Sequence, residues 1–181
     1  MGFKLVEALC ISNGLRKEDA FKYLDLVAVS IASDIVPITG ENRILAQYGL
    51  RKLNKQPSAG LNSIKEVCGI ADKTVDISDI VFKIGPRINA SGRLYNGSEA
   101  VQLLTSSNDE VLLRKSTDID SYNSERKDMD KSTTEDAKRQ FCQQPDYCNK
   151  KSIVLYNPLW NKGIVGIVAS RIAEEFSRRT H

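Results

Sequence analysis

Two arginines, Arg87 and Arg93, lie six residues apart in a short segment that contains two glycines and a proline. Pro86 fixes its own φ, and Gly85 and Gly92 accept backbone conformations that other residues avoid. This segment is therefore expected to form a shaped loop that neither continues the helix before it nor joins the one after it.

Asn89 and Ser91 lie between the two arginines and alternate with Ile88 and Ala90. An extended backbone would place the polar side chains on one side and seat the apolar ones in the core. Guanidinium groups bind phosphate or carboxylate through paired hydrogen bonds, so two of them with an amide and a hydroxyl fit a phosphate site. The alternative is that both arginines pair with acidic neighbours and fasten the loop.

Asp34 is a second candidate, because it follows an apolar helical stretch and stands shortly before Pro37. An acid in such surroundings is unfavourable unless it binds a charged group. The alternative is a carboxylate at a helix end that hydrogen-bonds a turn. Asp25, earlier in the same stretch, is expected to be solvated or paired rather than catalytic.

Gly163 and Gly166 open an apolar helical pattern directly after a turn. The start of a helix presents backbone N–H groups and the positive end of the helix dipole, which suit a phosphate. Ser170 and Arg171, one to two turns further on, could reach the same ligand. Small residues at this spacing also allow a helix to pack closely on a strand, so the pattern alone does not decide.

The composition is that of an ordinary globular protein of 181 residues, with 41% hydrophobic and 27% charged residues. The net charge is only +3, so any affinity for nucleic acid must come from local clusters. No apolar run approaches the length of a membrane span, and no signal-peptide pattern opens the chain, so a cytoplasmic location is expected.

The cysteines and the single histidine exclude several kinds of site. The four cysteines lack the spacing of a structural zinc site and are expected to be reduced thiols: Cys10, Cys68, Cys142 and Cys148. The one histidine is His181, so neither a Ser-His-Asp triad nor an imidazole-rich metal site is possible in this chain.

Periodicity predicts a mainly helical chain. Helices are expected near residues 3–10, 17–36, 40–56, 61–68, 78–84, 98–105, 109–143 and 162–176, with one strand at 152–156. The stretch 109–143 has no glycine or proline and only a thin apolar stripe, which favours a helix that bridges two lobes. An exposed arm packed on a partner chain is the alternative.

Three stretches resemble, in the same order, motifs of the RecJ family of single-stranded-DNA-specific exonucleases, in the DHH phosphoesterase superfamily. They are LDLVAVSIASDIVP at 24–37, GPRINASGRL at 85–94 and GIVGIVASR at 163–171. The resemblance implies that Asp34 is one of the aspartates that hold two divalent ions, Mn²⁺ or Mg²⁺, for phosphodiester hydrolysis. It also implies that the other metal ligands lie in motifs before residue 1, so the isolated chain is expected to lack exonuclease activity.

The same resemblance identifies the segment from Gly163 as the start of a DHHA1 substrate-binding lobe. Ser170 and Arg171 would then lie near the nucleic-acid backbone or its 5′ end. Many relatives have a histidine where this chain has Asn161, which leaves the role of Asn161 open. Tyr95, next to the arginine segment, is a candidate for stacking on a base, although packing explains it more simply.

Together these observations predict an internal segment of a RecJ-like exonuclease that degrades single-stranded DNA from 5′ to 3′ in recombination and repair. The expected parts are the helical end of an α/β DHH domain at 1–107, a bridging helix at 108–145, and the first β-α unit of an α/β DHHA1 domain at 146–181. Two alternatives remain: a DHH phosphoesterase for oligonucleotides, cyclic dinucleotides or polyphosphate, and a non-catalytic helical scaffold.

Overall fold

The structure is a computed structural model, which describes residues 2–145, 147 and 150–177. Its helices, in chain order, are α1 (Gly2–Ser12), a 3-10 helix (Lys17–Tyr23), α2 (Leu24–Ser33), α3 (Gly40–Lys55), α4 (Ala59–Val67), α5 (Ile77–Asp79), a π-helical turn (Ile80–Ile84), α6 (Gly85–Leu94), α7 (Ser98–Thr105), α8 (Asp109–Cys142) and α9 (Val165–Ser177). The expectations for Cys148 and for the chain end at 178–181 lie outside the described residues. The prediction of a mainly helical chain is confirmed.

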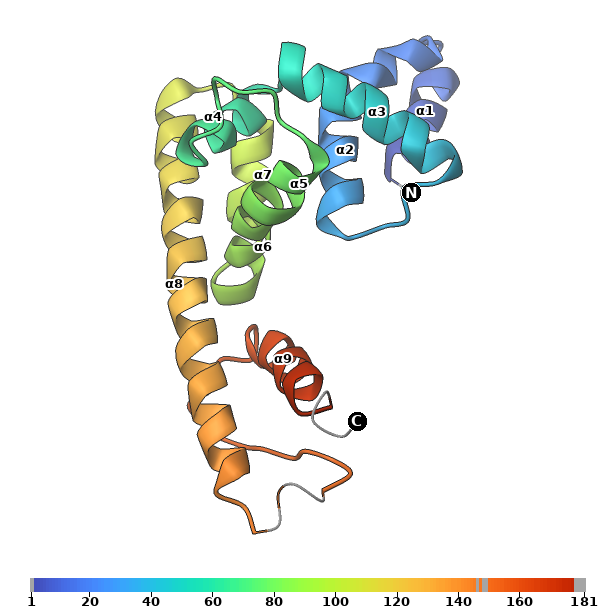
Figure 1. Cartoon of the computed structure of the whole chain (residues 1–181). Helices are drawn as coiled ribbons and strands as arrows, with labels where there is room; N and C mark the ends of the chain where they lie inside the picture. Colours follow the sequence, from blue (N-terminus) through green and yellow to red (C-terminus); the bar gives the residue numbers. More distant parts are fainter. Residues whose placement is uncertain (1, 146, 148–149, 178–181) are drawn as a thin grey trace.

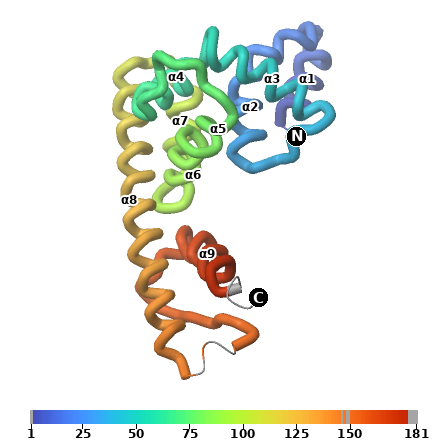
Figure 2. The backbone as a smooth tube through the Cα atoms, in the orientation of Figure 1, coloured from blue at the N-terminus to red at the C-terminus, as the bar shows by residue number. Residues whose placement is uncertain are grey.

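α8 runs along one edge of the molecule, and the other helices are arranged beside it (Figure 1). Helices α4, α6 and α7 pack against its first half, and α9 packs against its second half. Figure 2 follows the chain from the N-terminal helices, down α8, and back to α9. Asn108 caps the start of α8, where its side chain accepts a hydrogen bond of 3.1 Å from the Val111 amide.

The first hydrophobic core lies among α2 to α8. Its fully buried side chains include Leu53, Leu61, Ile80, Leu103 and Ile119. Each buried Leu or Ile contributes about 1.5–3 kcal/mol relative to an exposed one. Ile119 belongs to α8, so the long helix supplies part of this core.

A second, smaller core lies between the end of α8 and α9. It consists of Ala137 from α8 and Ile164, Val168 and Ile172 from α9 and the turn before it. Leu94, at the end of α6, packs against this second core. The same helix α8 therefore contributes side chains to both cores, as a bridging helix would.

The strand expected at 152–156 does not form, and residues 153–157 run as an extended segment. Ile153 and Leu155 pack toward the second core, whereas Val154 and Tyr156 are 81% and 79% exposed. This alternation is that of a strand. A ladder needs a neighbouring strand, and no described residues provide one.

Some helix boundaries differ from the predictions. The stretch 17–36 is not one helix, because a 3-10 helix precedes α2 and Ile35 has a φ of +52° just beyond the end of α2. Gly14 and Gly69 adopt positive φ after α1 and α4, as expected for glycines that end helices.

Within the described residues, no helix is long and apolar enough to cross a membrane. The thiols of Cys10, Cys68 and Cys142 are free. Cys68 packs against the first core, and burial raises the pKa of its thiol.

Candidate nucleic-acid interface

The arginine segment forms helix α6 and not a loop, so that expectation is wrong. A π-helical turn precedes it, and the Gly85 amide donates to the Ile80 carbonyl five residues back. Pro86 is the second residue of α6, directly after the π-helical turn, and its fixed φ is compatible with a helix there. The chain therefore remains helical through both residues that were expected to break it.

Helical geometry separates the four polar side chains of this segment, so the expected single polar side is also wrong. Ser91 is fully buried, and its hydroxyl donates to the Ile88 carbonyl at 2.8 Å. Asn89 and Arg93 lie four residues apart and are both exposed. Arg87 is turned away from these two, toward α8.

Arg87 is held by an acidic partner on α8. Its Nε donates to Asp120 Oδ1 at 2.7 Å, and its Nη1 donates to the Lys83 carbonyl at 2.9 Å. The Arg87 side chain is only 14% exposed. These contacts fasten α6 to α8, and a phosphate at Arg87 would have to compete with Asp120.

Arg93, at the end of α6, contacts the turn before α9. Its Nη1 donates to the Gly163 carbonyl at 3.2 Å. The backbones meet closely, because a Cβ atom at Gly163 would lie 2.2 Å from the Arg93 carbonyl oxygen. The contact brings together two motifs that are 70 residues apart in the sequence.

Asn161 closes the turn that carries Gly163. Its side-chain oxygen accepts a hydrogen bond of 2.8 Å from the Gly163 amide, and its carbonyl accepts from Ile164 and Val165. Of the N–H groups expected to be free at the start of this helix, that of Gly163 is therefore already bonded. Gly166 differs from Gly163, because no atom lies within 4 Å of a Cβ built there.

Arg171 reaches back from α9 to α8. Its Nη1 lies 2.9 Å from Asp130 Oδ2, and the Arg171 side chain is 53% exposed whereas that of Asp130 is 4% exposed. Ser170 is exposed, and its hydroxyl donates to the Gly166 carbonyl at 3.1 Å, as helical serines often do. Arg171 thus keeps much of its surface open to solvent beside a buried counterion.

Arg126 is a residue of this junction that sequence reasoning missed. It is half-buried on α8, and desolvation is the main cause of a lowered pKa of its guanidinium. The charge of Asp130 opposes this shift, and the nearby charges of Arg93 and Arg171 add to it. The Arg93 and Arg171 guanidiniums and the Asp130 carboxylate therefore lie close enough to Arg126 to influence its charge. The spacing of Arg126 and Asp130, four residues apart, was the signal available in the sequence.

Asp34 is exposed at the end of α2, beside the start of α6. Ser33, its neighbour, packs so closely on Gly85 that a Cβ at Gly85 would lie 2.6 Å from Ser33 Oγ. Ile35, the next residue, has a φ of +52°, which is strained for a β-branched side chain. Asp25 is fully buried and is paired, as expected: it accepts from Lys52 Nζ at 3.3 Å and from the Ser58 amide at 2.7 Å.

The described residues do not by themselves form a two-metal centre. No group of three or more Asp, Glu, His or Cys side chains comes together among them. Asp34 supplies one carboxylate, and a site for two divalent ions needs several. No catalytic step is therefore assigned to metal ions bound by these residues alone.

Tyr95 is engaged in packing within the chain. Its ring stacks on Tyr122 with centroids 4.0 Å apart, and its hydroxyl donates to Glu125 Oε2 at 2.5 Å. A base would have to displace or extend this stack.

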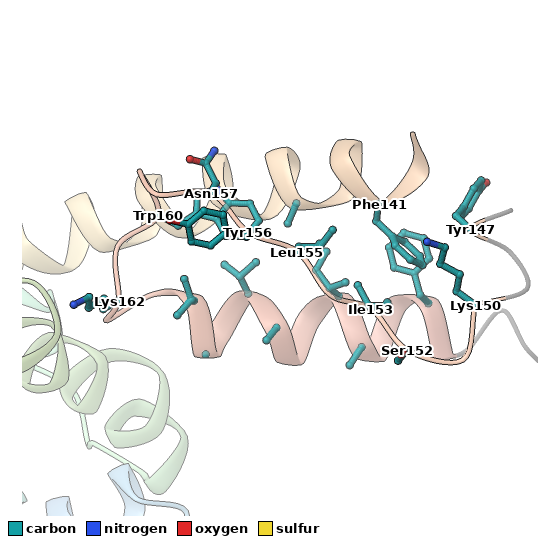
Figure 3. A pocket seen from close by; sticks show the side chains of 18 of the residues that line it. Phe141, Tyr147, Lys150, Ser152, Ile153, Leu155, Tyr156, Asn157, Trp160 and Lys162 are labelled. Carbon is teal, nitrogen blue, oxygen red and sulfur yellow. The ribbon is translucent and has the colours of Figure 1, made fainter. Parts of the chain in front are cut away.

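An apolar groove of about 1420 Å³ lies between the end of α8, the segment 150–160 and α9. Figure 3 shows Phe141, Leu155 and Ile153 along it, with Lys162 and Lys150 toward its two ends. Gly166 is the one predicted site residue that lines it, and the three arginines of the junction do not. The groove is thus separate from the charged junction.

No family model matches the chain. Known proteins nevertheless resemble it over most of its length. RecJ of Dickeya dadantii is 35% identical over 171 residues, which are 92% of this chain and 29% of that protein. RecJ of Bacillus subtilis is 32% identical over 171 residues, 94% of this chain and 22% of its own length. Both relatives are described as single-stranded-DNA-specific exonucleases.

Solved structures agree with the sequence matches. RecJ from Thermus thermophilus in complex with Mg²⁺ superposes with a TM-score of 0.82 at 32% identity, over 96% of this chain and 27% of the other. A manganese-bound exonuclease RecJ superposes with a TM-score of 0.83 at 30% identity, over 96% of this chain and 43% of the other.

The helical architecture is therefore that of part of a DHH/DHHA1 protein. Within that superfamily the chain is related to the RecJ exonucleases and corresponds to an internal segment of them, as its arginine motif predicted. The chain spans less than a third of the length of the curated relatives it matches.

Proposed function

We propose that the chain is part of a RecJ-like exonuclease and forms one wall of its path for single-stranded DNA. The observation that supports this proposal is the junction of α6, α8 and α9, where exposed Arg93 contacts the turn before α9 and exposed Arg171 pairs with α8. Exposed guanidiniums on two neighbouring helices are suited to successive backbone phosphates. Asn89, exposed on α6, offers a further donor, and Ser170 is exposed on α9.

Arg87 and Ser91 have a different part in this proposal. Both make hydrogen bonds inside the fold, so they hold α6 in place while Arg93 contacts the single-stranded DNA. Gly163 allows the turn before α9 to approach α6, and Gly166 leaves open space on α9. Asn161 keeps the turn closed.

The reaction we propose for the complete enzyme is 5′-to-3′ hydrolysis of single-stranded DNA in recombination and repair, in the cytoplasm. RecJ structures hold Mg²⁺ or Mn²⁺, and such ions activate water and stabilise the developing charge on phosphate. Asp34 would supply one metal ligand, and the others would come from outside the described residues. The boundaries 1–107, 108–145 and 146–181 remain our proposal for the parts of the two domains and the bridging helix.

The test is single-strand binding by the 181-residue chain, measured by fluorescence anisotropy with a labelled oligothymidylate. The double variant Arg93→Ala, Arg171→Ala should weaken binding at least tenfold, because two charged contacts are lost. Arg114→Ala removes an exposed charge from the other end of α8 and should leave the affinity within about twofold. Equal affinity of the double variant and the wild type would contradict the proposal that this surface binds single-stranded DNA.

Two further outcomes would favour the alternatives. In a full-length protein that contains this segment, faster hydrolysis of dinucleotides than of long single strands would indicate a different DHH phosphoesterase. Binding of the single strand without any manganese-dependent hydrolysis by that full-length protein would indicate a scaffold. The isolated chain is expected to release no nucleotides with Mn²⁺.

A further inference from the structure

Arg126 is a partly desolvated guanidinium that makes no hydrogen bond or ion pair with the described residues. It is half-buried on the face of α8 toward α6 and α9, and its Nε is shielded from solvent without an acceptor. A desolvated charge without a partner is unfavourable in a folded protein. The position therefore calls for an anion that the described part of the chain does not supply.

The carboxylate of Asp130, near Arg126, has a partner at only one of its two oxygens. Asp130 is 3% exposed, and its Oδ2 receives Arg171 whereas its Oδ1 is buried without a partner among the described residues. Asn123, also on α8, is 1% exposed, and its Oδ1 likewise lacks a partner there. Asn123 and Asp130 both lie on α8 with Arg126, three positions before it and four positions after it.

The charges at the junction do not balance. The charges of Arg93 and Arg171 act on the Arg126 guanidinium, and Asp130 is the carboxylate that opposes them and pairs with Arg171. An anion at the junction would relieve the repulsion among the three arginines. A phosphodiester group has the charge and the acceptor geometry for guanidinium donors.

We propose that Arg126 contacts a backbone phosphate of single-stranded nucleic acid at this junction, and that Asp130 is a positioning residue that holds Arg171 toward the same strand. This inference rests on the proposed function, and it adds two residues of α8 that neither the arginine motif nor the glycine motif contains. Asp130 acts through Arg171, since its own charge would repel a phosphate.

The first experiment measures oligothymidylate affinity of the 181-residue chain over a series of salt concentrations. Arg126→Ala should lower the affinity roughly tenfold. It should also reduce the slope of log Kobs against log [salt] by about 0.7, the value for one phosphate contact on a single strand. Lys127→Ala is the matched control, because Lys127 is the exposed next residue of α8, and it should change neither quantity measurably.

The outcomes separate this inference from the proposed function. If the wild-type chain does not bind the oligonucleotide, the proposed function fails and this inference fails with it. If the wild type binds and Arg126→Ala matches it in affinity and slope, only the inference about Arg126 is overturned. Arg126→Gln, which keeps much of the side-chain length, replaces the alanine variant with the same criteria if circular dichroism shows that the alanine variant is unfolded.

A second arm distinguishes a nucleic-acid phosphate from free phosphate. Inorganic phosphate should raise the melting temperature of the wild type no more than that of Arg126→Ala at millimolar concentration. A phosphate-induced shift that Arg126→Ala abolishes, with oligothymidylate affinity unchanged, would assign the site to a free anion and overturn the nucleic-acid assignment.

The role of Asp130 is tested by the sign of its effect. Asp130→Asn removes a negative charge, so simple electrostatics would strengthen binding of the strand. If Asp130 positions Arg171, the same variant should weaken binding several-fold and should have no effect in the Arg171→Ala background. Tighter binding by Asp130→Asn, or an equal effect in both backgrounds, would overturn the positioning role.

Discussion

The backbone of Gly163 lies against that of Arg93, so that a Cβ atom at Gly163 would be 2.2 Å from the Arg93 carbonyl oxygen. The Arg93 side chain completes this contact by donating to the Gly163 carbonyl at 3.2 Å. One glycine therefore sets the distance between the end of α6 and the start of α9. The position of Arg93 relative to Arg171 depends on that distance.

Gly163→Ala should separate α9 from α6. The new methyl group meets backbone atoms that cannot move independently, so we expect a loss of about 1–3 kcal/mol in the free energy of unfolding. Amide hydrogen exchange in α9 should also become faster, which mass spectrometry would detect. Gly166→Ala is the control, because its methyl group has open space and alanine favours a helix. Equal effects of the two substitutions would contradict the close contact.

Arg87 and Arg93 should respond differently to alanine substitution. Arg87→Ala removes the partner of Asp120 and half-buried packing, and should lower the free energy of unfolding by roughly 1–2 kcal/mol. Arg93→Ala should change it by no more than about 0.5 kcal/mol, yet weaken oligothymidylate binding. Denaturant unfolding and anisotropy measure the two effects. If Arg93→Ala instead lowered the stability and Arg87→Ala weakened binding, the roles proposed for the two arginines would be wrong.

Gly85→Ala should disturb the junction between α2 and α6. Its Cβ would lie 2.6 Å from Ser33 Oγ and 3.0 Å from Ser33 Cβ, next to Asp34. We expect a loss of about 1–3 kcal/mol in the free energy of unfolding. Gly92→Ala, on the same helix, has only Gly97 Cα at 4.0 Å and should be neutral or stabilising. Thermal unfolding of both variants decides whether space or helix propensity governs these positions.

Asp79 should give the chain a specific acid sensitivity. Lys73 and Lys83 lie 2.7 and 2.9 Å from Asp79 Oδ1, and the hydrogen bond from Lys73 is the main cause that lowers the pKa of Asp79 to about 2. Because the folded-state pKa is depressed, this stabilisation is present above the unfolded-state value near 4 and is lost as the pH falls toward 2.

The measurement is the free energy of unfolding of the wild type and of Asp79→Asn across that range. The variant should be less stable at pH 7, and the difference should shrink between about pH 4 and pH 2. Asp72→Asn, at an exposed position nearby, is the control and should show no such pH-dependent difference. A difference for Asp79→Asn that stays constant to pH 2 would contradict the ion pairs.

The sequence was informative about elements whose signals are local. The helix α8 was predicted because the stretch 109–143 has neither glycine nor proline and keeps an apolar stripe. The arginine segment was misjudged because Gly85 and Pro86 were interpreted as breakers. In the structure a π-helical turn leads directly into them, and the chain stays helical through both. The expected strand lacks a neighbour among the described residues.

The site was predictable where a motif carries it and not where tertiary contacts create it. Arg93 and Arg171 stand in recognisable stretches, but the contact between these stretches is made at Gly163, 70 residues from Arg93. Arg126 belongs to no motif, because its surroundings come from three helices. Its spacing to Asp130 was visible in the sequence, yet many exposed pairs on a polar helix share that spacing.

The most direct test of the account follows the arginine side chains of the 181-residue chain by NMR during titration with oligothymidylate. The Nε–Hε signals of Arg93, Arg126 and Arg171 should shift together with one dissociation constant, whereas that of Arg87 should stay in place because Asp120 holds it. Shifts confined to Arg87, or no shift at any of the four at saturating oligonucleotide, would contradict the claim that the α6, α8 and α9 junction receives the strand.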